Sequence, residues 1–132
     1  MIAAAPARTL EDRIRAQGYG LGFDLVGITT LGAMDTAPHF DAWLDRGFAG
    51  DMHYLPKWQH KRRDSRLPYE GVRSAIVVAL NYGGREPTGP VARYARGDDY
   101  HDVMDARLRE LHRWIADDIG RDVRGRAYVD AG

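Results

Sequence analysis

The clearest hydrophobic pattern in the chain is a helical one near its C-terminal end. Five apolar residues recur there at spacings of four, three, four and four positions: Met104, Leu108, Leu111, Ile115 and Ile119. Residues three or four apart share one face of a helix, so the pattern predicts a helix over about residues 99–119 with one buried stripe. Asp98 or Asp99 can cap its first turn, and Gly120 follows its last turn.

Two compact apolar segments predict β-strands. One is residues 23–29 (FDLVGIT), and the other is residues 74–82 (SAIVVALNY), with an unbroken apolar run at 75–80. A strand without polar alternation is typical of an inner strand that is covered on both faces of an α/β sheet. A further short strand is predicted in residues 126–132 (RAYVDAG). The pattern favours an α/β fold in which helices flank an open mixed sheet.

Two shorter helices are predicted in the N-terminal half of the chain. Thr9 can cap the first helix, with Asp12 as its capping-box partner, and glycines 18 and 20 end it. Residues 37–47 (APHFDAWLDRG) place an aromatic and apolar stripe at helical spacing. Residues 48–70 are expected to be irregular, and residues 1–8 are expected to be a disordered start.

Composition narrows the classes of protein. The chain has 132 residues, 44% of them hydrophobic and 29% charged, which suits one globular domain over residues 9–132. There are 19 basic and 19 acidic residues, so the overall charge does not indicate a nucleic-acid binder. No cysteine is present, which excludes disulfides and cysteine-bound iron–sulfur clusters within this chain. No segment approaches the roughly 18 apolar residues of a membrane span, so no membrane partner is expected.

The basic residues are concentrated in one segment. Residues 57–66 (KWQHKRRDSR) contain five Lys or Arg and one Asp, next to aromatic side chains. Such a segment can bind phosphates and stack on bases. A solvated run of charges is the commoner outcome, and the sequence leaves both interpretations open.

Residues 92–101 (ARYARGDDYH) gather several hydrogen-bonding side chains just before the long predicted helix. Helix capping explains the aspartates, because negative charge is favoured in a first turn. It does not explain His101, whose imidazole should prefer the neutral form there. A metal site built from Asp99, His101 and Asp102 is disfavoured because adjacent helix residues do not face one centre, and no metal ligand is assigned.

Asp130 is the second candidate, at the carboxyl end of the last predicted strand. Ligands of open α/β sheets gather beyond such ends. A carboxyl group half withdrawn from water there would have a raised pKa and could hold a proton for delivery. Asp130 can equally be a turn residue of the sequence DAG, and the residues alone do not decide.

Four motifs, taken in order, resemble the N-terminal domain of epoxyqueuosine reductases: GFAGDMHYL (47–55), GVRSAIVVALNY (71–82), ARYARGDDYHDVMDARLREL (92–111) and AYVDAG (127–132). The resemblance runs from about residue 22 to residue 132. It implies an α/β cobalamin-binding domain, similar in shape to the cobalamin domain of reductive dehalogenases and to flavin-reductase-like folds. It also implies reduction of epoxyqueuosine to queuosine in tRNA, with electrons delivered to cobalamin through two [4Fe–4S] clusters.

The resemblance also assigns candidate site residues. The family's catalytic acid falls on Asp130, which would donate a proton to the epoxide oxygen and face the cofactor. Asp99, Tyr100 and His101 match the family's DYH and would contact the flipped modified base. Arg62, Arg93 and Tyr82 are candidates for contacts to cobalamin.

The remaining expectations also follow from the resemblance. The partner would be the tRNA anticodon loop, and the protein would be a cytoplasmic monomer. The cysteine motifs that hold the clusters in the family are missing here, so the chain would end before the iron–sulfur domain and would be inactive alone. Two other interpretations remain open: a stand-alone corrinoid-binding or carrier domain, and an α/β interaction domain whose aspartates are only caps.

Overall fold

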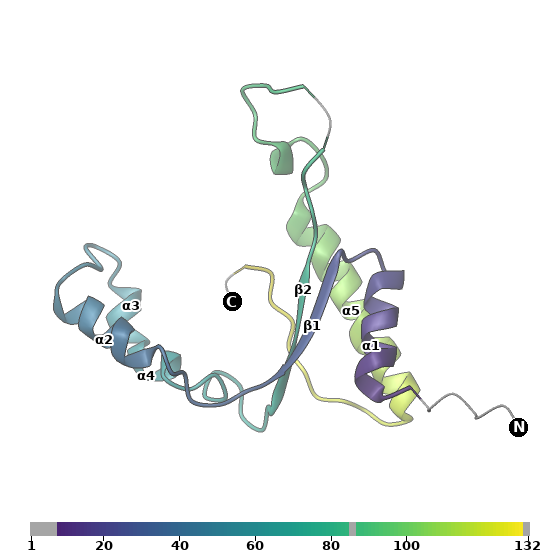
Figure 1. Ribbon diagram of the computed structural model, residues 1–132, viewed down its shortest axis with the longest axis horizontal. Coiled ribbons are helices and arrows are strands. Elements are labelled where there is room, and N and C mark those ends of the chain that lie inside the picture. The colour runs from purple at the N-terminus through teal and green to yellow at the C-terminus, as the bar shows by residue number, and fades with distance from the viewer. Residues whose placement is uncertain (1–7, 85–86, 131–132) are drawn as a thin grey trace, which may run out of the picture. The chain divides into compact units, whose positions relative to one another are not determined.

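The computed structural model describes residues 8–84 and 87–130, so most of the expected disordered start lies outside the described residues. Figure 1 shows the order of elements along the chain. In sequence they are α1 (Leu10–Gly20), β1 (Leu25–Thr30), α2 (Ala37–Asp45), α3 (Tyr54–Lys57), α4 (Gln59–Arg62), β2 (Ser74–Ala79), the 3₁₀ turn η1 (Arg93–Ala95) and α5 (Tyr100–Ile119).

The chain forms two compact units. Unit 1 comprises residues 1–27 and 77–132, and unit 2 comprises residues 28–76. The division passes through β1 and β2, so each unit contains a part of both strands.

Unit 1 contains α1 and α5, which lie side by side (Figure 1). Its buried apolar residues come from α1, from the segment before β1, from β1 itself and from the predicted stripe of α5: Ile14, Phe23, Val26, Leu111 and Ile115. Arg13 of α1 donates two hydrogen bonds to the Asp118 carboxylate of α5, at 3.1 and 2.7 Å. Apolar burial and an ion pair therefore hold the two helices together.

The predicted caps are confirmed at the start of α1 and at both ends of α5, whereas Gly18, which was expected to help end the first helix, lies inside α1, which ends at Gly20. The Thr9 hydroxyl accepts a hydrogen bond from the Asp12 amide at 3.1 Å, and the Asp12 carboxylate accepts one from the Thr9 amide at 3.3 Å. This reciprocal capping box satisfies two amides that have no partner inside the helix. Asp99 caps α5, and Gly120 follows α5 in the left-handed conformation at φ 71°.

The described residues form one sheet, of two strands. The Asp24 amide donates to the Ala79 carbonyl at 2.9 Å, and the Leu31 amide donates to the Arg73 carbonyl at 2.8 Å. The residue numbers along β2 fall as those along β1 rise, so the two strands are antiparallel. The expectation of a mixed sheet was therefore wrong for this part of the chain. The prediction that both faces of the strand over residues 75–80 are covered was also wrong. Val77 is 60% exposed, and only the sheet face that bears Val26 is buried.

A strand was predicted over residues 126–132, of which the structure describes residues 126–130, and these form no strand. Asp130 has φ 60°, a left-handed conformation that a strand does not accommodate. The segment is instead tied to α5 through Asp130, which accepts from the Tyr100 hydroxyl, and the preceding residues are held where His112 Nε2 lies 2.5 Å from the Val123 carbonyl oxygen. Residues 131 and 132 lie outside the described residues.

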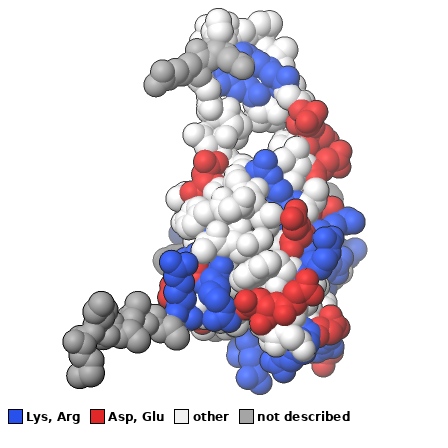
Figure 2. Space-filling view, turned by 90° about the vertical axis from the view of Figure 1, so that its right-hand side faces the viewer, with Lys and Arg blue, Asp and Glu red and all other residues white. Residues whose placement is uncertain are grey.

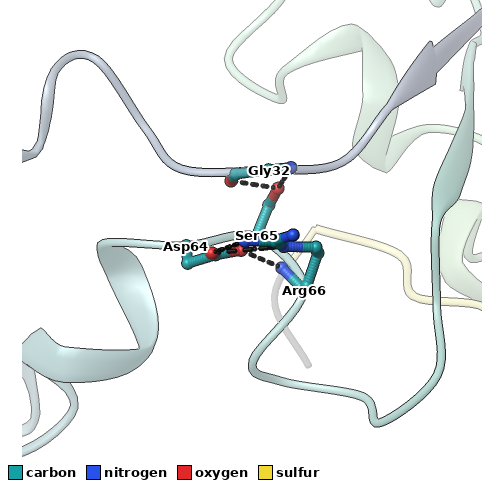
Figure 3. Close-up of polar contacts among 4 residues, drawn as sticks. All are labelled: Gly32, Asp64, Ser65 and Arg66. Atoms are coloured by element: carbon teal, nitrogen blue, oxygen red, sulfur yellow. Dashed lines mark hydrogen bonds and ion pairs between the residues drawn. The ribbon is translucent and has the colours of Figure 1, made fainter.

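Unit 2 contains α2, α3 and α4. The expectation of an irregular segment over residues 48–70 was wrong at α3 and α4, two helices of four residues each, which are too short to show a hydrophobic period. Figure 3 shows how the following turn is fixed. The Ser65 hydroxyl accepts from the Gly32 amide at 2.9 Å and donates to the Gly32 carbonyl at 3.0 Å.

The same turn neutralises one of the basic residues. The Arg66 guanidinium lies 2.5 Å from the Asp64 carboxylate, and its hydrogen bonds lower the pKa of Asp64 to about 2. Ala33 and Asp64 form an isolated antiparallel bridge, so this ion pair is attached to the segment that follows β1.

Figure 2 views the molecule from the side on which α1 and α5 lie, and basic and acidic side chains are intermixed there. None of the described helices is long and apolar enough to cross a membrane.

Candidate functional site

The start of α5 organises the first part of the site. The Asp99 carboxylate caps the helix by accepting from the His101 amide at 2.9 Å, and the same oxygen lies 2.8 Å from His101 Nδ1. The hydrogen bond from the His101 amide, and then the one from its ring, lower the pKa of Asp99. A carboxylate on Nδ1 favours a proton on that nitrogen and leaves Nε2 to face another partner.

Asp130 supplies that partner. Its Oδ2 accepts a hydrogen bond from the Tyr100 hydroxyl and lies 3.5 Å from His101 Nε2. Of the described residues other than glycine, Asp130 alone has a positive φ, and this turn directs its side chain to the start of α5. Its side chain is 61% exposed, so the expected withdrawal from water is not provided by the described residues.

Tyr100 responds to this contact. The hydrogen bond to Asp130, followed by partial desolvation, raises the pKa of the Tyr100 phenol to about 12. The phenol therefore remains a hydrogen-bond donor at neutral pH. Its ring stacks on the His101 ring, with the ring centroids 4.0 Å apart.

The result is a continuous polar chain, Asp99–His101–Asp130, with Tyr100 donating to its exposed end. An imidazole that lies between two carboxylates can take up a proton at one ring nitrogen and release one from the other. The arrangement places an imidazole nitrogen and a phenol hydroxyl beside one exposed carboxyl group.

Aromatic rings connect this cluster to Tyr82, in the segment after β2. Tyr82 and Tyr94 meet edge to face at 5.9 Å between centroids, and Tyr94 and Tyr100 meet in the same way at 6.1 Å. Tyr82 is 70% exposed and Tyr94 51% exposed, so both rings are accessible. Tyr94 was not among the site residues assigned from the sequence. Its place six residues before Tyr100 in the motif ARYARGDDYH was the available signal.

A shallow pocket of about 260 Å³ lies beside Tyr82. Its lining residues come from the segments after β2 and around η1: Tyr82, Gly83, Gly84, Arg93, Arg96 and Gly97. Arg93 donates to the Gly84 carbonyl, and Arg96 donates to the Val91 carbonyl at 2.8 Å and to the Pro87 carbonyl at 3.0 Å. Two of the predicted cofactor contacts, Tyr82 and Arg93, thus line the same pocket.

Arg62, another predicted cofactor contact, lies in α4 of unit 2, whereas Tyr82, Arg93 and Asp130 lie in unit 1. Its guanidinium carbon is 5.9 Å from the Phe40 ring centroid. Within residues 8–84 and 87–130, no group of three or more His, Asp or Glu side chains is arranged to hold a metal ion.

The comparisons with known proteins agree with one another. Residues 62–131 match the family model described as epoxyqueuosine reductase QueG, DUF1730. An epoxyqueuosine reductase of Gloeobacter violaceus is 42% identical over 130 residues, covering 91% of this chain and 39% of the relative. That of Cellulophaga algicola is 36% identical, covering 92% and 41%, and that of Salmonella typhimurium is 32% identical, covering 92% and 34%.

These relatives are considerably longer than this chain, which spans about two fifths of the length of the first two. No solved structure matches it. The family model covers more than half of the chain, including α5 and Asp130, and it is the family whose motifs the sequence resembles. The chain therefore belongs to the epoxyqueuosine reductase family.

Proposed function

We propose that this chain is the N-terminal part of an enzyme that reduces epoxyqueuosine to queuosine in tRNA, and that Asp130 is its proton donor. The observation that carries the proposal is the contact of Asp130 with Tyr100 and His101, which lie 30 and 29 positions earlier in the sequence. All three residues fall within the segment matched by the family model. The relatives are named as reductases, so a stand-alone corrinoid carrier is not favoured.

The chemistry needs an acid. Removal of the epoxide oxygen consumes two electrons and two protons and releases water, leaving an alkene. An epoxide oxygen that departs without a proton carries a full negative charge, and protonation by a positioned acid typically accelerates such steps 10²–10⁴-fold. The exposed carboxyl group of Asp130 can approach a substrate oxygen directly.

Asp99 and His101 position this acid and restore its proton. With Asp99 at Nδ1, the imidazole presents Nε2 to Asp130 and can return a proton after each delivery. Tyr100 donates to the same carboxylate oxygen, which leaves the second oxygen of Asp130 for the substrate.

Asp99, Tyr100 and His101 are also the proposed contacts of the modified base. A base extruded from an RNA stack needs flat partners and edge hydrogen bonds to offset the unstacking. The stacked Tyr100 and His101 rings, continued by Tyr94, supply flat partners of this kind.

The residues also fit a corrinoid. A corrin ring is broad and largely apolar, with amide groups at its rim. Leu25 of β1 and Val77 of β2 are 66% and 60% exposed, so the strands offer an apolar surface to such a ring. The neighbouring pocket offers Tyr82 and Arg93 for the polar rim, together with Gly83 and Gly84, which have no side chains to obstruct it. When bound, cobalamin would supply the reducing electrons to the epoxide.

Iron–sulfur clusters do not fit this chain, which has no cysteine to ligate them. If [4Fe–4S] clusters deliver the electrons, another segment or another protein holds them. The same proposal implies the anticodon loop of tRNA as partner and the cytoplasm as compartment, with the protein acting as a monomer.

The test compares Asp130→Asn with wild type in the longest open reading frame that contains this chain, expressed with corrinoid. We expect Asp130→Asn to lower the rate of queuosine formation at least 100-fold, because an amide cannot donate the proton. Asp122→Asn is the matched control, since Asp122 is exposed and makes no ion pair within the described residues. An unchanged rate for Asp130→Asn would show that Asp130 is not the acid.

A further inference from the structure

Unit 2 presents a basic and aromatic surface outside the site described above. We define the α3–α4 surface by Lys57, Trp58 and Lys61. The Lys57 and Lys61 ammonium nitrogens lie 5.1 and 4.3 Å from the centroid of the Trp58 ring. Trp58 is 41% exposed, so its indole remains accessible between the two cations.

The lysines of this surface keep their charge uncompensated. Two neighbouring cations are neutralised, because Arg63 pairs with Asp41 at 2.9 Å and Arg66 pairs with Asp64. Within the described part of the chain, neither Lys57 nor Lys61 has a carboxylate at ion-pair distance. Lys57 and Lys61 thus hold their positive charge beside Trp58, while Arg62 of the same segment lies 5.9 Å from the Phe40 ring centroid.

The backbone around Lys61 is held in place by contacts with α2. The Asp41 carboxylate of α2 accepts from Gln59 Nε2 at 2.6 Å with one oxygen and binds Arg63 with the other. Both partners flank Lys61 in sequence, so α2 fixes the backbone that presents this partly exposed lysine. A fixed backbone lowers the entropic cost of binding a ligand.

Cations beside an exposed indole suit a ligand that alternates negative charges with flat rings. Single-stranded nucleic acid has this chemistry, because lysines bind its phosphates while aromatic rings stack on its bases. An acidic peptide would use the lysines but would leave the indole without a planar partner.

We propose that the α3–α4 surface binds a single-stranded segment of the substrate RNA, with Lys57 and Lys61 on phosphates and Trp58 against a base. This inference rests on the proposed function, because it takes its RNA from there. It adds a second contact region on α3 and α4, separate in sequence from the residues that would receive the modified base.

The test measures binding of the 132-residue chain to an unmodified anticodon stem-loop RNA by fluorescence anisotropy over a series of salt concentrations. For wild type we expect affinity to fall as salt rises. Each lysine–phosphate contact contributes about −0.7 to the slope of log K against log salt for single strands. The double variant Lys57→Ala/Lys61→Ala should therefore make the slope shallower by about 1.4.

Trp58→Ala should weaken binding about tenfold without changing the slope, because stacking releases no counterions. Trp58→Phe, which keeps a flat ring, should recover part of that loss. The matched control is Arg113→Ala/Arg124→Ala, which removes two exposed cations from unit 1. Equal losses for the control and for the lysine variant, or no loss for either, would overturn the proposal.

Two further results separate this inference from the proposed function. Binding of an unmodified stem-loop needs neither cofactor nor epoxide, so it is measured independently of the reductase reaction. If heparin competes with equal strength and Trp58→Ala has no effect, the surface is only a polyanion site and the proposal is wrong. If the α3–α4 variants bind RNA and reduce epoxyqueuosine like wild type, the proposal fails while the proposed function stands.

Discussion

Asp130 determines how the candidate site is assembled. With φ 60° its backbone leaves the extended conformation, which an aspartate tolerates better than most residues. The turn ends any continuation of an extended segment and brings the carboxylate to Tyr100 and His101. The turn at Asp130 therefore goes together with the polar chain at the start of α5.

Tyr100 reports this contact through its titration. We expect its phenol to titrate at about 12 rather than at the ordinary value near 10, because ionisation would remove the hydrogen bond to Asp130 and place two anions together. In Asp130→Asn the pKa should move back toward the ordinary value. The measurement is an NMR pH titration of ¹³C-labelled tyrosine, with the resonance assigned by Tyr100→Phe. Titration of Tyr100 near 10 in wild type would contradict the contact.

The same shift has a consequence for stability. Because the folded state holds the Tyr100 proton more tightly than the unfolded state, this contribution is fully present below pH 10. It is lost as pH rises from about 10 through about 12. Tyr100→Phe should lack this part of the alkaline loss of stability, which a series of denaturant titrations would show.

Several elements were predictable because their signals are local. The stripe and caps of α5 and the capping box of α1 depend on residues at most four positions apart, and the structure contains both helices at nearly the expected bounds. The strand prediction for residues 126–130 failed because the β-favouring residues there are outweighed by a tertiary contact, that of Asp130 with α5. The helices α3 and α4 were missed because four residues cannot display a period.

The site was predictable only in part for the same reason. The cap role of Asp99 follows from local pattern, whereas the proximity of Asp130 and Tyr100 required a family motif, because nothing in their spacing indicates it. Tyr94 was missed as a bridge between Tyr82 and Tyr100, since ring contacts depend on the tertiary path of η1.

The packing of α1 on β1 depends on one glycine. A Cβ added to Gly18 would lie 2.8 Å from Val26 Cγ2, and Val26 is buried and β-branched, so it cannot rotate away easily. We expect Gly18→Ala to lower the free energy of unfolding by about 1 kcal/mol, because overpacking outweighs the gain in helix propensity.

Gly20, in the same helix, is the matched control. A Cβ at Gly20 meets nothing within 4 Å, so Gly20→Ala should be neutral or stabilise by up to about 1 kcal/mol. Urea denaturation of both variants measures the difference. If Gly18→Ala is as stable as Gly20→Ala, α1 does not pack closely on β1 at that position.

The two units differ in how much apolar surface they bury. Unit 1 buries four apolar side chains from α1, β1 and α5 and also Phe23, which lies between α1 and β1, whereas Ala49 is the sole buried apolar residue of unit 2 within the described part of the chain. Since apolar burial is the main favourable contribution to folding, the two units should open with different free energies. The proposed reductive site lies in the better-packed unit, and the proposed RNA surface lies in the other.

Hydrogen exchange followed by mass spectrometry tests this difference. We expect amides of α1 and α5 to exchange more slowly than those of α2, α3 and α4. Leu111 is 2% exposed, and Leu111→Ala should cost about 2–5 kcal/mol through the cavity it leaves. Its effect should be faster exchange in α1 and α5 and little change in α2–α4. Leu67→Ala, at a position 55% exposed in unit 2, is the control and should change neither pattern. One common exchange rate for all helices, accelerated everywhere by Leu111→Ala, would mean that the two units unfold together.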